Sequence, residues 1–279
     1  MDKECRTPGP LPDVPVPPKT RPRTARIGVW FAPQHTTVRE LRAAWREADS
    51  LGVDSLWLWD HFFPLTGDPD GTHFECWTLL AAMAAETTTA RVGTLVSNYA
   101  YRNPDLLADM ARTVDHIAGG RMVLGLGAGW FERDLKDYGY PVPGPGERVR
   151  GLIDTVARID HRLGLLRPGP LGELPLLIGG DGRQRLLRLA AERAVMWNTM
   201  AWRFAEGNRV LDDWCARIGR DPAQIERSAF VTRDQSEDEL RRLVDAGVQH
   251  LIFQVRHPFR LDGVRLALRV LRDRQDGRP

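Results

Sequence analysis

The 279-residue sequence contains few lysines and few cysteines. Its positive charge is carried almost entirely by arginine, since only Lys3, Lys19 and Lys136 are lysines. None of the three stands in the Gly-x-x-x-x-Gly-Lys-Ser/Thr loop that binds nucleoside triphosphates. The three cysteines are scattered and too few for a disulfide framework, which suits a reducing compartment. We therefore expect a cytoplasmic protein, with Cys76 as a buried and unreactive thiol.

The sequence also lacks long apolar runs and an excess of charge of one sign. No apolar stretch approaches the ~18 residues that a membrane span needs, and the first residues hold no apolar core of a secretory signal. Lys and Arg number 39 against 37 Asp and Glu, a net charge of +2. No electrostatic field therefore favours nucleic acid or anionic lipid. We expect neither a nucleic-acid partner nor a membrane partner.

Several motifs that mark enzyme classes are missing. There is no Gly-x-Ser-x-Gly elbow, which argues against a serine hydrolase of that type. The 7 histidines form no His-Glu-x-x-His motif and no close pairing with cysteine, so we expect no metal site. The run Gly125-Leu-Gly127-Ala-Gly129 leads into a proline-broken loop, and its spacing differs from the nicotinamide fingerprint.

The organisation of the chain changes near residue 26. Residues 1–25 are proline-rich with almost no large apolar side chains, and they predict a flexible tail. Eight apolar, strand-like runs follow, at 27–31, 55–59, 92–97, 122–126, 174–178, 195–199, 229–232 and 251–255. Helical patterns alternate with them, at about 41–51, 75–86, 104–117, 147–163, 185–194, 206–218, 237–246 and 264–272. This count predicts a single α/β domain, a (β/α)8 TIM barrel over 26–273 with a short tail at 274–279. A doubly wound sheet is the alternative.

In such a barrel, chemistry belongs at the carboxyl ends of the strands. Asp60 and His61 follow the second strand, and an imidazole there can donate or accept a proton near neutral pH. The alternative is a histidine bonded to a loop carbonyl, with Asp60 capping a turn.

Two glycine-rich segments follow later strands. Gly125, Gly127 and Gly129 indicate either the close approach of a ligand or backbone, or a bend at a barrel corner. The segment Ile178–Arg183 joins a strand to a helix, which suits a phosphate or a plain turn. Trp130 and Trp197 are the tryptophans whose places near strand ends could face a substrate.

These pieces together resemble the luciferase-like monooxygenase superfamily, in particular its coenzyme F420-dependent oxidoreductases. The resemblance covers about residues 26–271 and is strongest in five blocks: Asp60–Pro64, Phe74–Leu80, Tyr101–Ala108, Asp115–Trp130 and Pro175–Gly180.

The resemblance implies a luciferase-like barrel that holds a deazaflavin ring at its mouth, with His61 as the proton-handling residue. It implies a non-proline cis peptide at Leu95-Val96, behind the ring. The cofactor-binding residues that it suggests are Asp60, Leu95, Val96, Asn98, Gly127, Ala128, Gly129, Gly179, Gly180, Asp181 and Gly182. The expected partners are a small-molecule or modified-peptide substrate and a second copy of the chain in a homodimer.

The implied reaction is hydride transfer between coenzyme F420 and an activated C=C, C=N or carbonyl carbon, in secondary metabolism. One alternative is an FMN-dependent monooxygenase with the same barrel, and another is a catalytically silent ligand-binding barrel. The sequence departs from the family pattern in two shortened stretches, 163–174 and 230–239, which implies an open substrate pocket or one completed by a partner. Asp181 stands where many relatives have glycine.

Overall fold

A computed structural model describes residues 25–182, 185–231 and 235–275, with side chains described to residue 270. Parts of four predictions lie outside these residues: the N-terminal tail up to residue 24, Arg183 of the glycine-rich segment, Thr232 of the seventh strand, and residues 276–279 of the second tail. Residues 274 and 275, predicted as tail, belong to the last helix.

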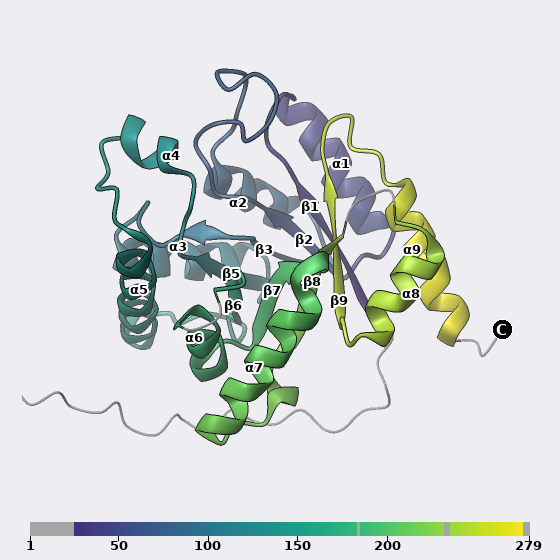
Figure 1. Ribbon diagram of the computed structural model, residues 1–279. Coiled ribbons are helices and arrows are strands. Elements are labelled where there is room, and N and C mark those ends of the chain that lie inside the picture. The colour runs from purple at the N-terminus through teal and green to yellow at the C-terminus, as the bar shows by residue number, and fades with distance from the viewer. Residues whose placement is uncertain (1–24, 183–184, 232–234, 276–279) are drawn as a thin grey trace, which may run out of the picture.

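The described strands form one closed parallel barrel (Figure 1). They are β1 (Arg26–Phe31), β2 (Ser55–Leu58), β3 (Arg91–Thr94), β4 (Ser97–Asn98), β5 (Met122–Gly127), β6 (Leu176–Gly179), β7 (Met196–Met200), β8 (Glu226–Val231) and β9 (His250–Val255). β1 pairs with both β2 and β9, and β3 pairs with β5. The ring therefore has no free edge. The predicted TIM barrel is confirmed, and the doubly wound alternative is wrong. The predicted third strand is split into β3 and β4 at Leu95 and Val96.

Helices surround the barrel in the predicted order. They are α1 (Val38–Ser50), α2 (Cys76–Glu86), α3 (Pro104–Ile117), α4 (Glu132–Asp137), α5 (Pro145–Leu165), α6 (Arg185–Arg193), α7 (Phe204–Ile218), α8 (Glu237–Asp245) and α9 (Asp262–Gln275). Asn103 caps α3 by accepting from the amides of Asp105 and Leu106, as its place before Pro104 predicts. The six-residue α4 was not predicted, because it lies in a segment whose prolines indicate a loop. No helix among the described residues combines the length and apolarity needed to cross a bilayer.

Two apolar clusters stabilise this arrangement, and strand alternation decides which side chain joins which. In β2, Leu56 and Leu58 belong to the outer cluster between strands and helices. Trp57 and the following Trp59 belong to the inner cluster within the barrel. Successive side chains on a strand point to opposite faces, so strands such as β2, β5 and β9 contribute to both clusters.

Polar groups close the amino-terminal end of the barrel. His250 contacts Ser55 Oγ through Nε2 at 2.8 Å and Glu226 through Nδ1 at 2.7 Å, while Arg26 pairs with Glu226 at 2.6 Å. The Ser–His–Glu order matches a hydrolase triad. However, Ser55 is 0% exposed, and its hydroxyl also accepts from Trp57 Nε1 at 2.6 Å. A substrate has no access to this hydroxyl, so the network is structural and the open end of the barrel lies opposite.

Candidate functional site

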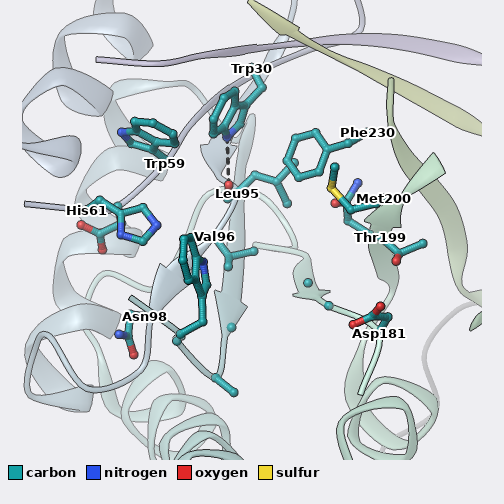
Figure 2. Close-up of a pocket in the computed structure, with 18 of the residues that line it drawn as sticks. Trp30, Trp59, His61, Leu95, Val96, Asn98, Asp181, Thr199, Met200 and Phe230 are labelled. Atoms are coloured by element: carbon teal, nitrogen blue, oxygen red, sulfur yellow. Dashed lines mark hydrogen bonds between the residues drawn. The ribbon is translucent and has the colours of Figure 1, made fainter. Parts of the chain in front are cut away.

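A pocket of about 610 Å³ opens at the carboxyl ends of the barrel strands (Figure 2). All the residues predicted to bind a cofactor line it, together with His61 and Trp130. Figure 2 shows His61 and Asn98 on one side and Asp181 and Thr199 on the other, with Trp30 above Leu95 and Phe230 to its right. The sequence segments that were predicted from strand ends therefore converge on one site.

One wall of the pocket is the bulge between β3 and β4. The peptide bond between Leu95 and Val96 is cis, as the resemblance implied. Trp30 Nε1 donates to the Leu95 carbonyl at 2.9 Å, which fixes the bulge against the barrel interior (Figure 2). The Trp30 ring itself meets Trp59 and Phe230 edge to face, with centroids 4.7 and 5.6 Å apart. The deep part of the pocket is therefore flat-sided, aromatic and apolar.

The glycines of β5 and β6 accommodate this bulge. A Cβ atom at Gly125 would lie 1.9 Å from the Thr94 carbonyl oxygen. At Gly127 and Gly179 it would lie 2.5 and 2.7 Å from methyl groups of Val96. Of the two interpretations of the glycine run, close approach is therefore correct at these positions. It is the chain's own bulge that comes close.

His61 is held by an acidic partner that sequence reasoning missed. Its Nδ1 lies 2.6 Å from Oδ2 of Asp134 on α4, and Asp134 is fully buried. The same carboxylate accepts from the Tyr101 hydroxyl at 2.5 Å and from the Phe62 amide at 3.0 Å. Burial and the Asp134 hydrogen bond raise the pKa of Tyr101 far above its ordinary value, so its hydroxyl stays a donor. Nδ1 is thereby fixed as a donor, and Nε2 is the nitrogen left to act in the pocket.

A second histidine beside His61 is held neutral. Burial, together with the charge of His61, lowers the pKa of His73 to about 4. This agrees with the hydrogen bond that its Nε2 accepts from Trp59 Nε1 at 3.0 Å. His73 therefore supports the aromatic wall through Trp59.

Asp60 does not pair with His61, although the two are adjacent in sequence. Its carboxylate is fully buried and receives both Arg102 nitrogens, at 2.5 and 3.1 Å. Burial raises the pKa of Asp60 despite the opposing Arg102 charge. Asp60 lines the pocket, and its carboxylate is paired with Arg102. The contact between this residue and the ring stays a prediction.

The glycine-rich segment after β6 forms the opposite rim. Gly180 has φ +123°, and its amide donates to the Asn198 carbonyl at 2.9 Å. That amide is therefore not available to a phosphate, contrary to the expectation for Gly180. Asp181 pairs with Arg203 at 3.2 Å, which brings a guanidinium to the same rim. An anion there would meet Arg203 together with the amides of Asp181 and Gly182.

The two tryptophans predicted to face a substrate differ. Trp130 is 65% exposed, lines the pocket, and its ring lies 6.0 Å from that of His61. Trp197 is 0% exposed and packs in the outer cluster against Phe204, with its Nε1 donating to the Gly180 carbonyl. The expectation for Trp197 is wrong, because strand alternation turns the neighbouring Met196 to the barrel interior and Trp197 outward.

Sequence reasoning also missed pocket residues that no short motif marks. They are Trp30, Trp59, Leu65, Leu186, Asn198, Thr199, Met200, Phe230, Gln254 and Arg256. The alternation of each strand could have found several of them, since Trp30, Phe230 and Gln254 each lie two residues from another inward position. Among the described residues, no three metal-ligating side chains gather into one cluster.

The sequence and the structure are both similar to those of known proteins. The sequence is 28% identical over 182 residues to a 5,10-methylenetetrahydromethanopterin reductase of Archaeoglobus fulgidus, covering 60% of this chain and 50% of the relative. It is 31% identical over 115 residues to an F420-dependent glucose-6-phosphate dehydrogenase of Amycolatopsis mediterranei, covering 40% of this chain and 34% of the relative. The chain thus spans half or less of the length of these two relatives.

Among solved structures, an F420-dependent secondary alcohol dehydrogenase in complex with an F420-acetone adduct superposes with a TM-score of 0.79 at 16% identity. The match covers 90% of this chain and 100% of that one. The model of one family, described as luciferase-like monooxygenase, matches residues 23–278. The chain belongs to the luciferase-like monooxygenase family.

Proposed function

We propose that this chain is an oxidoreductase that uses coenzyme F420 for hydride transfer to or from an activated C=C, C=N or carbonyl carbon. The observation that carries the proposal is a flat, aromatic pocket with an imidazole of fixed tautomer at its edge. The relatives add support, since one is named as F420-dependent and another as a reductase.

The residues of the pocket fit a tricyclic ring with a phosphate-bearing tail. Leu95 and Val96 offer an apolar surface on which a flat ring can lie, and Asn98 offers an amide at its edge. The rim at Asp181 and Gly182, with Arg203 beside it, would hold the phosphate. Gly127 and Gly179 let Val96 pack closely against β5 and β6, since a Cβ there would lie 2.5 or 2.7 Å from its methyl groups.

A bound deazaflavin supplies a carbon centre that exchanges hydride and does not activate oxygen. His61 Nε2 gives a proton to the substrate atom that becomes negatively charged, or removes it in the reverse direction. Asp134 holds the His61 ring in place by accepting from Nδ1, so Nε2 is the nitrogen that exchanges the proton. Trp130 and Trp59 flank the imidazole and limit the access of water.

The test is a fluorescence titration of the purified chain with coenzyme F420 and, separately, with FMN. We expect saturable F420 binding in the wild type, and in His61→Ala an affinity within a few-fold of it together with a loss of about 100-fold or more in turnover. His161→Ala, an exposed histidine outside the pocket, is the matched control. Tight FMN binding without F420 binding would instead support the monooxygenase alternative. Binding of neither cofactor would support the silent barrel.

A further inference from the structure

Among the described residues that line the pocket, Arg256 is the one charge without a partner. Four of these residues are ionisable, and three of the four contact an opposite charge. These pairs are Asp60 with Arg102 at 2.5 Å, His61 with Asp134 at 2.6 Å, and Asp181 with Arg203 at 3.2 Å. The Arg256 guanidinium has no hydrogen-bond or ion-pair partner within the described part of the chain. The described lining of the pocket therefore carries one uncompensated positive charge.

The position of Arg256 follows from the alternation of β9. Leu251, Phe253 and Val255 belong to the outer cluster. Ile252 belongs to the inner cluster, and Gln254 and Arg256 continue this inward row up to the pocket. The row runs from an apolar side chain, through an amide, to a cation at the rim. A ligand that lies along this row would place its apolar part deep in the pocket, beside the apolar side chain, and its charged group at the rim, beside the cation.

Arg256 lies apart from the rim that would hold the cofactor phosphate. That rim follows β6, whereas Arg256 follows β9, and β7 and β8 stand between them in the barrel order. The neighbours of Arg256 are the strands of Phe230 and Trp30, because β9 pairs with both β8 and β1. The sector between Arg256 and the Leu95 bulge therefore has aromatic walls and a single cation at its outer edge.

We infer that the substrate of this site is a carboxylic acid with a planar, apolar body, and that Arg256 binds its carboxylate. A guanidinium binds a carboxylate through two parallel hydrogen bonds. Arg256 offers one free cation, which matches a monoanion, whereas a phosphate dianion at this position would call for a second cation that no other described lining residue offers. The inference rests on the proposed function, because it assigns the aromatic sector to the substrate that lies beside the bound ring.

Calorimetric titration with trans-cinnamate and trans-cinnamamide tests this inference. The two probes share a planar body and an activated C=C bond, and they differ in charge. We expect cinnamate to bind the F420-loaded wild type about tenfold more tightly than cinnamamide, as one charge-assisted ion pair predicts. In Arg256→Gln the ratio should fall to about one, with the affinity for cinnamamide unchanged. Arg209→Gln, an exposed arginine of α7 outside the pocket, should keep the wild-type ratio.

Two outcomes would overturn the inference: equal affinities of the wild type for acid and amide, including no binding of either, or an unchanged ratio in Arg256→Gln. Each titration is repeated with the cofactor-free chain. A failure of F420 to bind then counts against the proposed function alone, since the acid–amide comparison can still be read.

Discussion

Replacing Asp134 with asparagine should change which nitrogen of the His61 ring carries the proton. In the wild-type chain, the Asp134 carboxylate accepts from His61 Nδ1, from the Tyr101 hydroxyl and from the Phe62 amide. A carboxylate has no proton to give, so Nδ1 is the donor and Nε2 faces the pocket without one in the neutral ring. Asparagine has nearly the same shape, but one of its two polar atoms is an NH2 group that can only donate.

The size of the effect follows from the His61–Asp134 contact. A hydrogen bond to a charged group contributes about 1.5–3 kcal/mol, which corresponds to a bias of about 10- to 150-fold toward the Nδ1–H form. Solvent screens little of this, because the side chains of His61 and Asp134 are 13% and 0% exposed. Asp134→Asn removes the bias toward the Nδ1–H form of His61. Where the NH2 group of the asparagine turns to the imidazole ring, the Nε2–H form is preferred instead. The variant should then present Nε2–H to the pocket, which cannot accept a proton.

The measurement is the pair of ¹⁵N chemical shifts of the ring, in protein labelled at histidine. The spectrum of His61→Ala identifies the His61 signals among those of the 7 histidines. We expect protonated Nδ1 in the wild type and protonated Nε2 in a large fraction of Asp134→Asn. Asp137→Asn, an exposed residue of the same helix, should leave the shifts unchanged. Identical His61 shifts in wild type and Asp134→Asn, or a wild-type ring protonated on Nε2 alone, would refute the reasoning.

Three further predictions concern the barrel around the site. Gly125→Ala should lower the free energy of unfolding in urea melts by about 3 kcal/mol or more, because its Cβ would lie 1.9 Å from the Thr94 carbonyl oxygen. Gly146→Ala is the control and should not destabilise the chain, since the space around Gly146 is open. Burial raises the pKa of Glu226, but the His250 hydrogen bond and nearby positive charges outweigh it, so the pKa lies below the ordinary 4.5. The stability that this carboxylate contributes is thus present above about pH 4.5 and is lost as the pH falls through the folded pKa. In urea melts from pH 7 to 3, the difference in free energy of unfolding between the wild type and Glu226→Gln should shrink. A difference that stays constant over this range would contradict the prediction. Trp197→Leu should cost about 2–4 kcal/mol of stability and leave F420 affinity unchanged, and a selective loss of affinity without destabilisation would restore Trp197 to the pocket.

The parts of the site that were predicted correctly are those encoded by local sequence at strand ends. The glycine run of β5 and the segment Leu95–Asn98 are each contiguous, and the closure of the barrel brings them together. The error for Trp197 has a physical cause. The expectation for Trp197 used proximity to a strand end without the phase of the strand. In β7, the alternation that places Met196 inward places Trp197 outward.

The partner of His61 could not be predicted in this way, because 73 residues separate it from Asp134. α4 is short and lies in a proline-rich segment, so no periodic pattern marks it. Contacts with distant segments hold α4, through the hydrogen bonds of Asp134 and through the ring of Tyr138, which directly follows the helix. Phe62 lies 4.4 Å from Tyr101 and 4.2 Å from Tyr138, measured between ring centroids.

These contacts divide the site into two parts with different physical origins. The proposed cofactor side is built from barrel strands, where main-chain pairing fixes Val96 against Gly127 and Gly179. The side that holds His61 is built from the loop after β2 and from α4. They meet at the Asp134 carboxylate, which accepts from His61 Nδ1 and from the main-chain amide of Phe62. Arg133 of α4 stacks on Phe63 at 4.0 Å, so a cation of the helix also covers an aromatic ring of the loop. Substitutions at Phe63 or Arg133 should therefore disturb the His61–Asp134 pair more than the strand-built side, because both residues lie outside the barrel strands.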